Sequence, residues 1–313
     1  MWITSQEYRS KVAGCWMGKN IGGTLGAPFE GQRGVVDIDF YTQDLGGEPL
    51  PNDDLDLQLV WLNAVEKYGR AVTASILGEY WHSYITPSWS EYGLGKNNMR
   101  KGLVPPLSGW VSNPYRDICG CFIRSEIWAC LAPGHPELAA RYAYEDAIVD
   151  HSTDGVYGEI FVAAVQSAAF VESDKFKLID IGLSWIPADC GVARGVRCAL
   201  ESLALRYRMV IGWLEQLNGG PLETIHIVGG GTQNRLLCQM AADACDRRVV
   251  TGPIEATAIG NLMMQAVSNG DVASIAEARE VIRNSFAVDE YVPTAPDPWH
   301  AAYERFVKLV EHE

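Results

Sequence analysis

Three carboxylates fall within four residues of this chain, at Asp53, Asp54 and Asp56, directly after Asn52. An asparagine followed by acidic residues is typical of a helix N-terminus, where the side-chain oxygen caps free backbone N–H groups and negative charge favours the positive end of the helix dipole. Three neighbouring carboxylates also repel one another unless a cation lies between them. Their hard oxygen atoms suit Mg²⁺ or Mn²⁺ better than zinc. Both interpretations, a capped helix and a metal site, stay open at this point.

A second run that could do chemistry is the glycine triplet Gly229, Gly230 and Gly231, which follows a short apolar segment and precedes Asn234. Glycine lets a backbone approach phosphate closely, and the N–H groups at a helix N-terminus attract anions. By itself such a triplet usually marks a turn. In this context it predicts a strand, a turn and a helix that could hold the phosphates of a nucleotide.

The elements that must position the carboxylates are helical. Apolar residues recur at intervals of three and four along the first 190 residues, which predicts helices over residues 5–17 (capped by Ser5), 53–67, 136–150 and 156–171. The segments 22–51 and 86–120 are rich in Gly, Pro, Ser and Asn, and we expect long functional loops there.

The pattern changes near residue 190, and strands begin to alternate with helices. We expect a long helix over residues 192–217, strands over 224–228 and 248–251, and helices over 234–244, 254–267, 275–284 and 299–310. This alternation predicts a partial α/β unit with a parallel pair of strands, in a chain that is mainly α. We therefore predict two domains, residues 1–190 and 191–313.

Composition limits the classes of partner. The chain of 313 residues has a formal net charge of −14, which disfavours nucleic acid and anionic membranes. The sequence shows no signal peptide or membrane span, and the eight scattered cysteines are typical of reduced thiols. We expect a cytoplasmic protein with a small-molecule ligand, and a homo-oligomer is an option because it would cover exposed strand edges.

Residues 1–189 resemble the ADP-ribosylglycohydrolase family. The resemblance rests on the acidic run and on further segments in the same order: residues 13–18 (AGCWMG), 26–31 (GAPFEG), 105–109 (PPLSG), 120–126 (GCFIRSE) and 144–158 (YEDAIVDHSTDGVYG). It implies an all-helical fold and hydrolysis of an ADP-ribosyl or related N- or O-glycosidic bond with a divalent metal.

The resemblance also implies roles for individual residues. Asn52, Asp53 and Asp54 would be metal ligands, with Asp53 and Asp54 also catalytic, and Glu30 would be a catalytic residue on a loop near the ribose. Gly120, Arg124 and His151 would lie near the bound ligand, although a core or capping role for His151 is an equal alternative.

Two departures from the family pattern predict impaired hydrolysis. Its second metal-binding run, of the type Asp-x-Asp-Thr, has no counterpart after residue 189, and Gly23-Thr24 stands where relatives often have Gly-Asp. A metal would therefore lose part of its ligand shell.

From about residue 192 to the end, the chain resembles the C-terminal part of carbohydrate kinases of the FGGY type, most closely the rhamnulokinases. The resemblance rests on the glycine triplet and on residues 197–208 (RCALESLALRYR) and 252–261 (GPIEATAIGN). It implies part of an actin-like nucleotide domain, with Gly229, Gly230 and Gly231 against the phosphates of ATP or ADP and Asn234 near the base or ribose.

Three hypotheses follow. The first is an ADP-ribosylglycohydrolase-like hydrolase of impaired activity that depends on Mg²⁺ or Mn²⁺. The second is a rhamnulokinase-like fragment that binds ATP or ADP, without the acceptor domain and catalytic base that phosphoryl transfer needs. The third is a fusion without activity, joined near residue 190.

Overall fold

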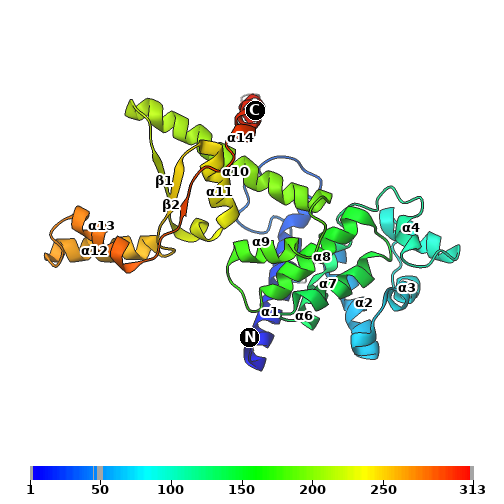
Figure 1. Cartoon of the computed structure of the whole chain (residues 1–313). Coiled ribbons are helices and arrows are strands. Elements are labelled where there is room, and N and C mark those ends of the chain that lie inside the picture. Colours follow the sequence, from blue (N-terminus) through cyan, green and yellow to red (C-terminus); the bar gives the residue numbers. More distant parts are fainter. Residues whose placement is uncertain (1–2, 45, 48–51, 311–313) are drawn as a thin grey trace. The chain divides into compact units, whose positions relative to one another are not determined.

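The computed structural model describes residues 3–44, 46–47 and 52–310, and it is mainly helical. The chain divides into two compact units, Met1–Ala193 and Arg194–Glu313, each with its own buried core. Figure 1 shows helices throughout the N-terminal part of the chain and strands only in the C-terminal part. Each unit is described here by itself.

The first unit is all-helical in its described residues, as its apolar periodicity predicts. Its helices are α1 (Ser5–Gly26), α2 (Asp53–Tyr68), α3 (Ala74–Ser83), α4 (Ser90–Arg100), α5 (Leu107–Trp110), α6 (Glu126–Leu131), α7 (Pro136–Ala147), α8 (Thr153–Ala168) and α9 (Lys175–Leu183), with short 3₁₀ turns at Ala27–Phe29, Gly69–Ala71 and Phe122–Arg124.

Helix α1 differs from its predicted bounds at both ends. Thr4, not Ser5, is the N-cap, and it forms a capping box with Glu7. The helix also runs past Met17 to Gly26, because single glycines only weaken a helix, and it continues into the 3₁₀ turn Ala27–Phe29. Its extension to Gly26 brings the end of α1 to the acidic run.

The acidic run begins helix α2 as predicted. Asn52 is the N-cap, and its Oδ1 accepts a hydrogen bond from the backbone N–H of Asp54 at 2.9 Å. Leu57, Trp61 and Ala64 form the buried face of the helix. Pro51, which precedes the cap in the sequence, lies outside the described residues.

Two other predictions for this unit were wrong in detail. The segment 86–120 was expected to be a loop but contains α4 and α5. Gly93, which looked like a loop residue, lies inside α4 and allows close packing, since a Cβ there would come within 2.1 Å of the Ser88 carbonyl oxygen. The helix expected over 136–150 ends at Ala147, since Asp150 and His151 enter a buried polar network, and the next helix starts at Thr153 instead of residue 156.

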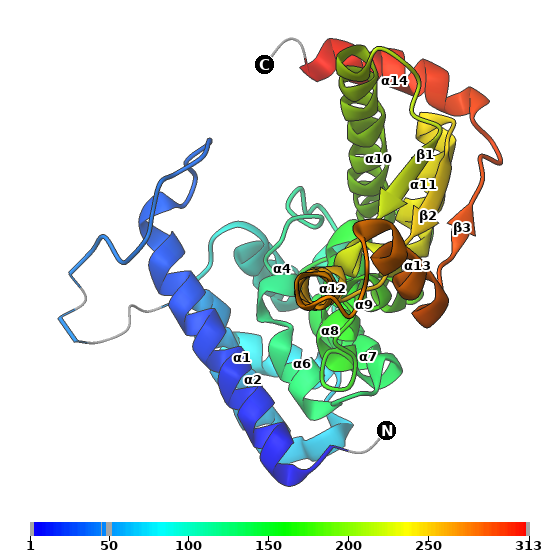
Figure 2. The same ribbon diagram turned by 90° about the vertical axis from the view of Figure 1, so that its left-hand side faces the viewer.

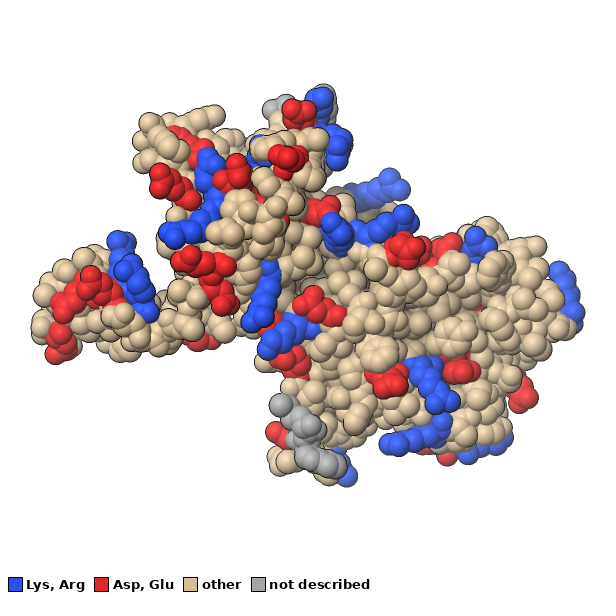
Figure 3. All heavy atoms as spheres, in the orientation of Figure 1, with Lys and Arg blue, Asp and Glu red and all other residues tan. Residues whose placement is uncertain are grey.

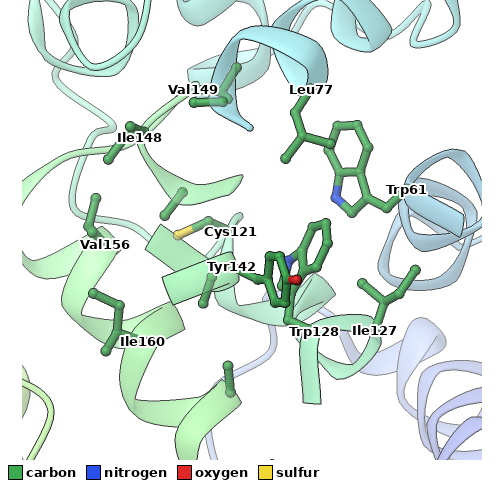
Figure 4. Packing of buried hydrophobic residues seen from close by; sticks show 14 of the residues in the cluster. Trp61, Leu77, Cys121, Ile127, Trp128, Tyr142, Ile148, Val149, Val156 and Ile160 are labelled. Atoms are coloured by element: carbon green, nitrogen blue, oxygen red, sulfur yellow. The ribbon is translucent and has the colours of Figure 1, made fainter. Parts of the chain in front are cut away.

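The core of the first unit contains large aromatic rings and closely packed alanines. Figure 4 shows Trp61 and Trp128 among the buried aliphatic side chains. Helices α7 and α8 pack against each other through small residues such as Ala143 and Ala163, which are fully buried. This dense core can hold polar side chains in fixed orientations.

The second unit contains a three-stranded sheet in the order β1-β2-β3 (Figure 2). Strands β1 (Thr224–Ile227) and β2 (Arg248–Thr251) pair in parallel, as predicted, and β2 pairs antiparallel with β3 (Glu290–Tyr291). Strand β3 was not predicted, because two residues carry no periodicity. The helices are α10 (Gly191–Asn218), α11 (Arg235–Cys245), α12 (Ala256–Asn269), α13 (Ile275–Ser285) and α14 (Asp297–Val310), with a 3₁₀ turn at Gly229–Gln233.

Helix α11 is the centre of this unit. One side of α11 buries Cys238, Ala241 and Ala242 against the sheet, and the other buries Leu237 and Met240 against α10 and α14. The unit is therefore a small α/β arrangement whose most buried helix begins directly after the glycine triplet.

The chain is acidic overall, and the face drawn in Figure 3 shows no segregation of charge. Figure 3 shows Lys and Arg interspersed with Asp and Glu on the face drawn, while the chain has 39 acidic and 25 basic residues. Within residues 3–44, 46–47 and 52–310, no helix is both long and apolar enough to cross a membrane.

Candidate functional site

The first unit contains a cavity of about 730 Å³ at the N-terminus of α2. Three segments form its walls: the end of α1 with the following turn, the start of α2, and the segment between α3 and α4. Its lining includes Gly23, Glu30, Asn52, Asp53, Asp54, Asp56, Tyr84, Trp89 and Tyr92. Glu30, Asn52, Asp53 and Asp54, the four catalytic and metal-ligand residues expected from the sequence, thus line one cavity.

Local contacts position the acidic side chains. The hydroxyl group of Tyr92 donates a hydrogen bond to Oδ2 of Asp53 at 3.2 Å. Asn52 lies so close to α1 that a Cβ at Gly23 would come within 2.3 Å of its Nδ2 atom. Glycine at position 23 therefore allows α1 to approach the start of α2.

The carboxyl group of Asp54 has a raised pKa. It is half-buried, and burial raises its pKa against the opposing effect of Lys19, whose Nζ lies 3.9 Å from Oδ2. The nearby carboxylates of Asp53, Glu126 and Glu30 raise the pKa of Asp54 further. Lys19 itself is held by Oε1 of Glu126 at 3.0 Å. A carboxyl group with a raised pKa can hold a proton and deliver it, as a general acid does.

Two of the expected metal-ligand residues also take part in hydrogen bonds. Oδ1 of Asn52 already accepts the capping hydrogen bond, and Asp53 is bonded to Tyr92. In the part of the chain that the structure describes, no three His, Cys, Asp or Glu side chains are grouped so as to hold a metal ion. The metal-ligand roles of Asn52, Asp53 and Asp54 therefore stay a prediction from the sequence.

The aromatic part of the cavity was missed by sequence reasoning. Tyr84 and Trp89 are exposed at its wall, whereas Tyr92 is buried and packs against the ring of Trp81 at 5.0 Å. Trp89 and Tyr92 lie in the Gly- and Ser-rich stretch 86–120 that was interpreted as a loop. The helical spacing of Trp89 and Tyr92 was the available signal.

Gly120, Arg124 and His151 do not line this cavity; they belong to a buried polar network beneath it. The guanidinium of Arg124 donates to Asp146 at 3.0 Å, to Asp150 at 2.7 Å and to the carbonyl oxygen of Gly120 at 2.9 Å. Burial alone would raise the pKa of Asp150, but Arg124 and then His151 lower it to about 2. In this buried ion network, loss of one charged partner leaves the others buried without compensation, which destabilises a fold strongly.

Glu91 and His151 face each other across Gly120. A Cβ at Gly120 would come within 1.9 Å of Oε1 of Glu91 and 3.3 Å of Cε1 of His151. Nδ1 of His151 lies 2.9 Å from Oδ1 of Asp150, which supports the core role of this histidine. Gly120 is therefore required for close packing of these two side chains.

The glycine triplet of the second unit forms a 3₁₀ turn between β1 and α11. Gly229 has a positive φ of 79°, and its N–H donates to the carbonyl oxygen of Pro253 at 3.2 Å. Gly230 is exposed, and a Cβ at this position would meet nothing within 4 Å. The exposed backbone of the turn, at Gly230, is the part open to a ligand.

Asn234 has a structural task at the end of this turn. It is buried, and its Oδ1 caps α11 by accepting a hydrogen bond from the N–H of Leu237 at 2.9 Å. The sequence assigned Asn234 to the base or ribose of a nucleotide, and this cap is a second reason for an asparagine there.

Comparisons with known proteins match the C-terminal part of the chain. Residues 184–269 match the model of the FGGY family of carbohydrate kinases, C-terminal domain. A rhamnulokinase of Bacteroides thetaiotaomicron is 47% identical over 115 residues, which are 37% of this chain and 24% of that protein. The rhamnulokinase of Pectobacterium carotovorum is 39% identical over 117 residues (37% of this chain and 24% of that protein), and that of Yersinia pestis 38% over 123 residues (39% and 25%).

The chain thus spans about a quarter of the length of the curated relatives it matches. The expected likeness of the C-terminal part to carbohydrate kinases is confirmed. The comparisons give no support to the expected likeness of residues 1–189 to ADP-ribosylglycohydrolases.

Proposed function

We propose that the second unit is a carbohydrate-kinase-type module that binds ATP or ADP at its glycine turn. The observation that carries this proposal is the match of residues 184–269 to the C-terminal domain of the FGGY kinases. The local geometry supports it, because exposed backbone at Gly230 precedes the N-terminus of α11, where N–H groups favour a phosphate. Transfer of phosphate to a sugar also needs an acceptor site and a base, so the proposal is limited to nucleotide binding.

Calorimetric titration of the full chain with ADP tests this proposal. Gly230→Asp should weaken binding at least about tenfold, because a carboxylate would repel the phosphates. Gly230→Ala is the matched control, since there is room for a Cβ, and it should bind within about threefold of the unchanged chain. Absence of ADP binding by the unchanged chain, or equal binding by the two variants, would refute the proposal.

A second candidate function concerns the cavity of the first unit, because four residues of the ADP-ribosylglycohydrolase-like pattern line it. We infer that this cavity binds an ADP-ribosyl or related glycosidic ligand. Asp54 would hold the proton that a leaving group needs, and Glu30 would lie at the cavity wall as a second carboxylate. Tyr92 would keep Asp53 oriented.

Binding of ADP-ribose, measured by the same calorimetry, tests this second function. Asp54→Asn removes the acid from the cavity, and Glu66→Gln removes an exposed carboxylate of the same helix outside it. We expect only the former to change the affinity or its pH dependence. If neither variant differs from the unchanged chain, or if ADP-ribose does not bind, the second function is wrong and the first is unaffected.

A further inference from the structure

Helices α1 and α6 lie against each other in opposite directions. The hydroxyl of Tyr8 donates to the carbonyl oxygen of Cys130 at 3.0 Å, and Nζ of Lys19 donates to Oε1 of Glu126 at 3.0 Å. Residues four and seven apart share a helix face, so Cys15 lies on the same side of α1 as these two contacts. This arrangement places Cys15 opposite Cys130.

The two side chains meet. The thiols of Cys15 and Cys130 are close enough for each to be the largest influence on the pKa of the other. All eight cysteines lie in the described part of the chain, and all are free thiols. Cys15 and Cys130 thus form a pair of free thiols in contact although they are far apart in sequence.

Their environments differ in a way that suits a reaction. Cys15 is partly exposed, whereas Cys130 is buried. The neighbouring Cys130 thiol lowers the pKa of Cys15 against the opposing effects of burial and Glu126, and the charge of Lys19 acts in the same direction as Cys130. The Cys15 thiol and burial raise the pKa of Cys130. The thiolate is the reactive form of cysteine, so the partly exposed Cys15 is the member of the pair that would react first with an oxidant.

We propose that Cys15 and Cys130 are a redox modification site, which a peroxide converts to a disulfide between α1 and α6. The Cys15 thiolate attacks one peroxide oxygen, the O–O bond breaks, hydroxide leaves, and Cys15 becomes a sulfenic acid. The sulfur of Cys130 then attacks the sulfur of Cys15, the S–O bond breaks, and the departing hydroxide takes the Cys130 proton as water. Two thiols are oxidised and, with the proton first released by Cys15, one hydrogen peroxide is reduced to two waters.

The cross-link has a structural consequence for the cavity. Gly23 and Gly26, further along α1, line the cavity at the N-terminus of α2. A disulfide would anchor α1 to α6 and restrict movement of this wall. It would also close a long loop of chain, which stabilises a fold chiefly by restricting the unfolded state. This inference does not depend on either proposed function.

The test uses the full chain treated with a small excess of hydrogen peroxide, followed by alkylation and peptide mass spectrometry without reduction. We expect the number of free thiols to fall from eight to six, a peptide joined through Cys15 and Cys130, reversal by dithiothreitol, and a melting temperature about 5 °C or more above that of the reduced chain.

Serine variants identify the pair. Cys15→Ser and Cys130→Ser should each abolish the cross-linked peptide, whereas Cys119→Ser, which removes an exposed thiol elsewhere, should retain it. If a variant fails to fold, the peptide analysis of the unchanged chain tests the proposal by itself. Cross-links that involve other cysteines, or oxidation of Cys15 to sulfinic acid without a disulfide, would overturn the proposal.

Discussion

Arg124 lies in a buried ion network of the first unit. Its side chain is fully buried, and the described structure pairs it with two aspartates and a backbone carbonyl. The rings of Trp81, Trp61 and Tyr92 surround the guanidinium at 5.1 to 6.0 Å from its central carbon. The segment 120–126 therefore contributes Arg124 to a buried ion network.

Replacement of Arg124 by Met should destabilise the first unit strongly. Asp146 and Asp150 would keep their buried positions without the cation, and loss of one partner from a buried pair costs about 3–5 kcal/mol. Arg116→Met is the matched control, because Arg116 and its partner Asp117 are exposed, and it should cost less than about 0.5 kcal/mol. Urea unfolding measures both values, and similar effects for the two variants would contradict this interpretation.

Glu159 is a buried acid in the same region. Neither of its carboxyl oxygens accepts a hydrogen bond in the described structure, and its side chain lies within hydrogen-bond reach of Asp146. Burial raises its pKa well above the ordinary value of 4.5, and the nearby Asp146 raises it further. The folded state therefore holds the Glu159 proton more tightly than the unfolded state does.

This difference predicts the sign of a pH effect. The contribution of Glu159 to stability is fully present below pH 4.5 and is lost as the pH rises toward the folded-state pKa. Glu159→Gln has no proton to lose, so it should be more stable than the unchanged chain at pH 8, by about 1–3 kcal/mol, and similar at pH 4. Melting curves at both pH values test this, and an equal difference at both would show a packing effect instead.

At the scale of elements, periodicity predicted most helices and both parallel strands, but it predicted helix ends less well. Helix α1 passes through glycines that looked like an end, and α7 stops where Asp150 turns into the ion network. Gly95 in α4 looked like a loop residue, although a Cβ there would come within 3.0 Å of the Asp150 side chain. These features depend on contacts between residues far apart in sequence, which local patterns do not contain.

The sequence predicted some residues of the candidate site and missed others. The acidic run, Asn52 and Glu30 line one cavity because α1 and α2 approach each other at Gly23. Tyr92 and Trp89 were not foreseen, since they come from a helix that the sequence did not reveal. The residue spacing around Arg124 indicated an important region, but only the structure shows that it is buried.

The cap of α11 gives a prediction at the element scale. Asn234→Ala removes the hydrogen bond to the N–H of Leu237 and should cost about 1 kcal/mol, whereas Asn234→Ser keeps a capping oxygen and should restore most of it. Denaturant unfolding of the second unit measures this. If Asn234 also contacts nucleotide as proposed, Asn234→Ser should still weaken ADP binding. An unchanged affinity would leave Asn234 with the capping role alone.

At the scale of the whole molecule, the chain contains two units with separate cores. The second unit has relatives among carbohydrate kinases, and the first has a well-formed acidic cavity. The identity of each domain stays a prediction. Whether the two units are energetically independent is a question that experiment can answer directly.

Separate cores predict two unfolding transitions, because cooperative units form around contiguous buried clusters. Scanning calorimetry of the full chain should resolve them, and the two variants above assign them. Arg124→Met should lower only the transition of the first unit, and Asn234→Ala only that of the second. ADP should raise the second transition alone if the glycine turn binds it, since a ligand stabilises the state to which it binds. A single transition that both variants shift equally would instead show that the chain unfolds as one cooperative body.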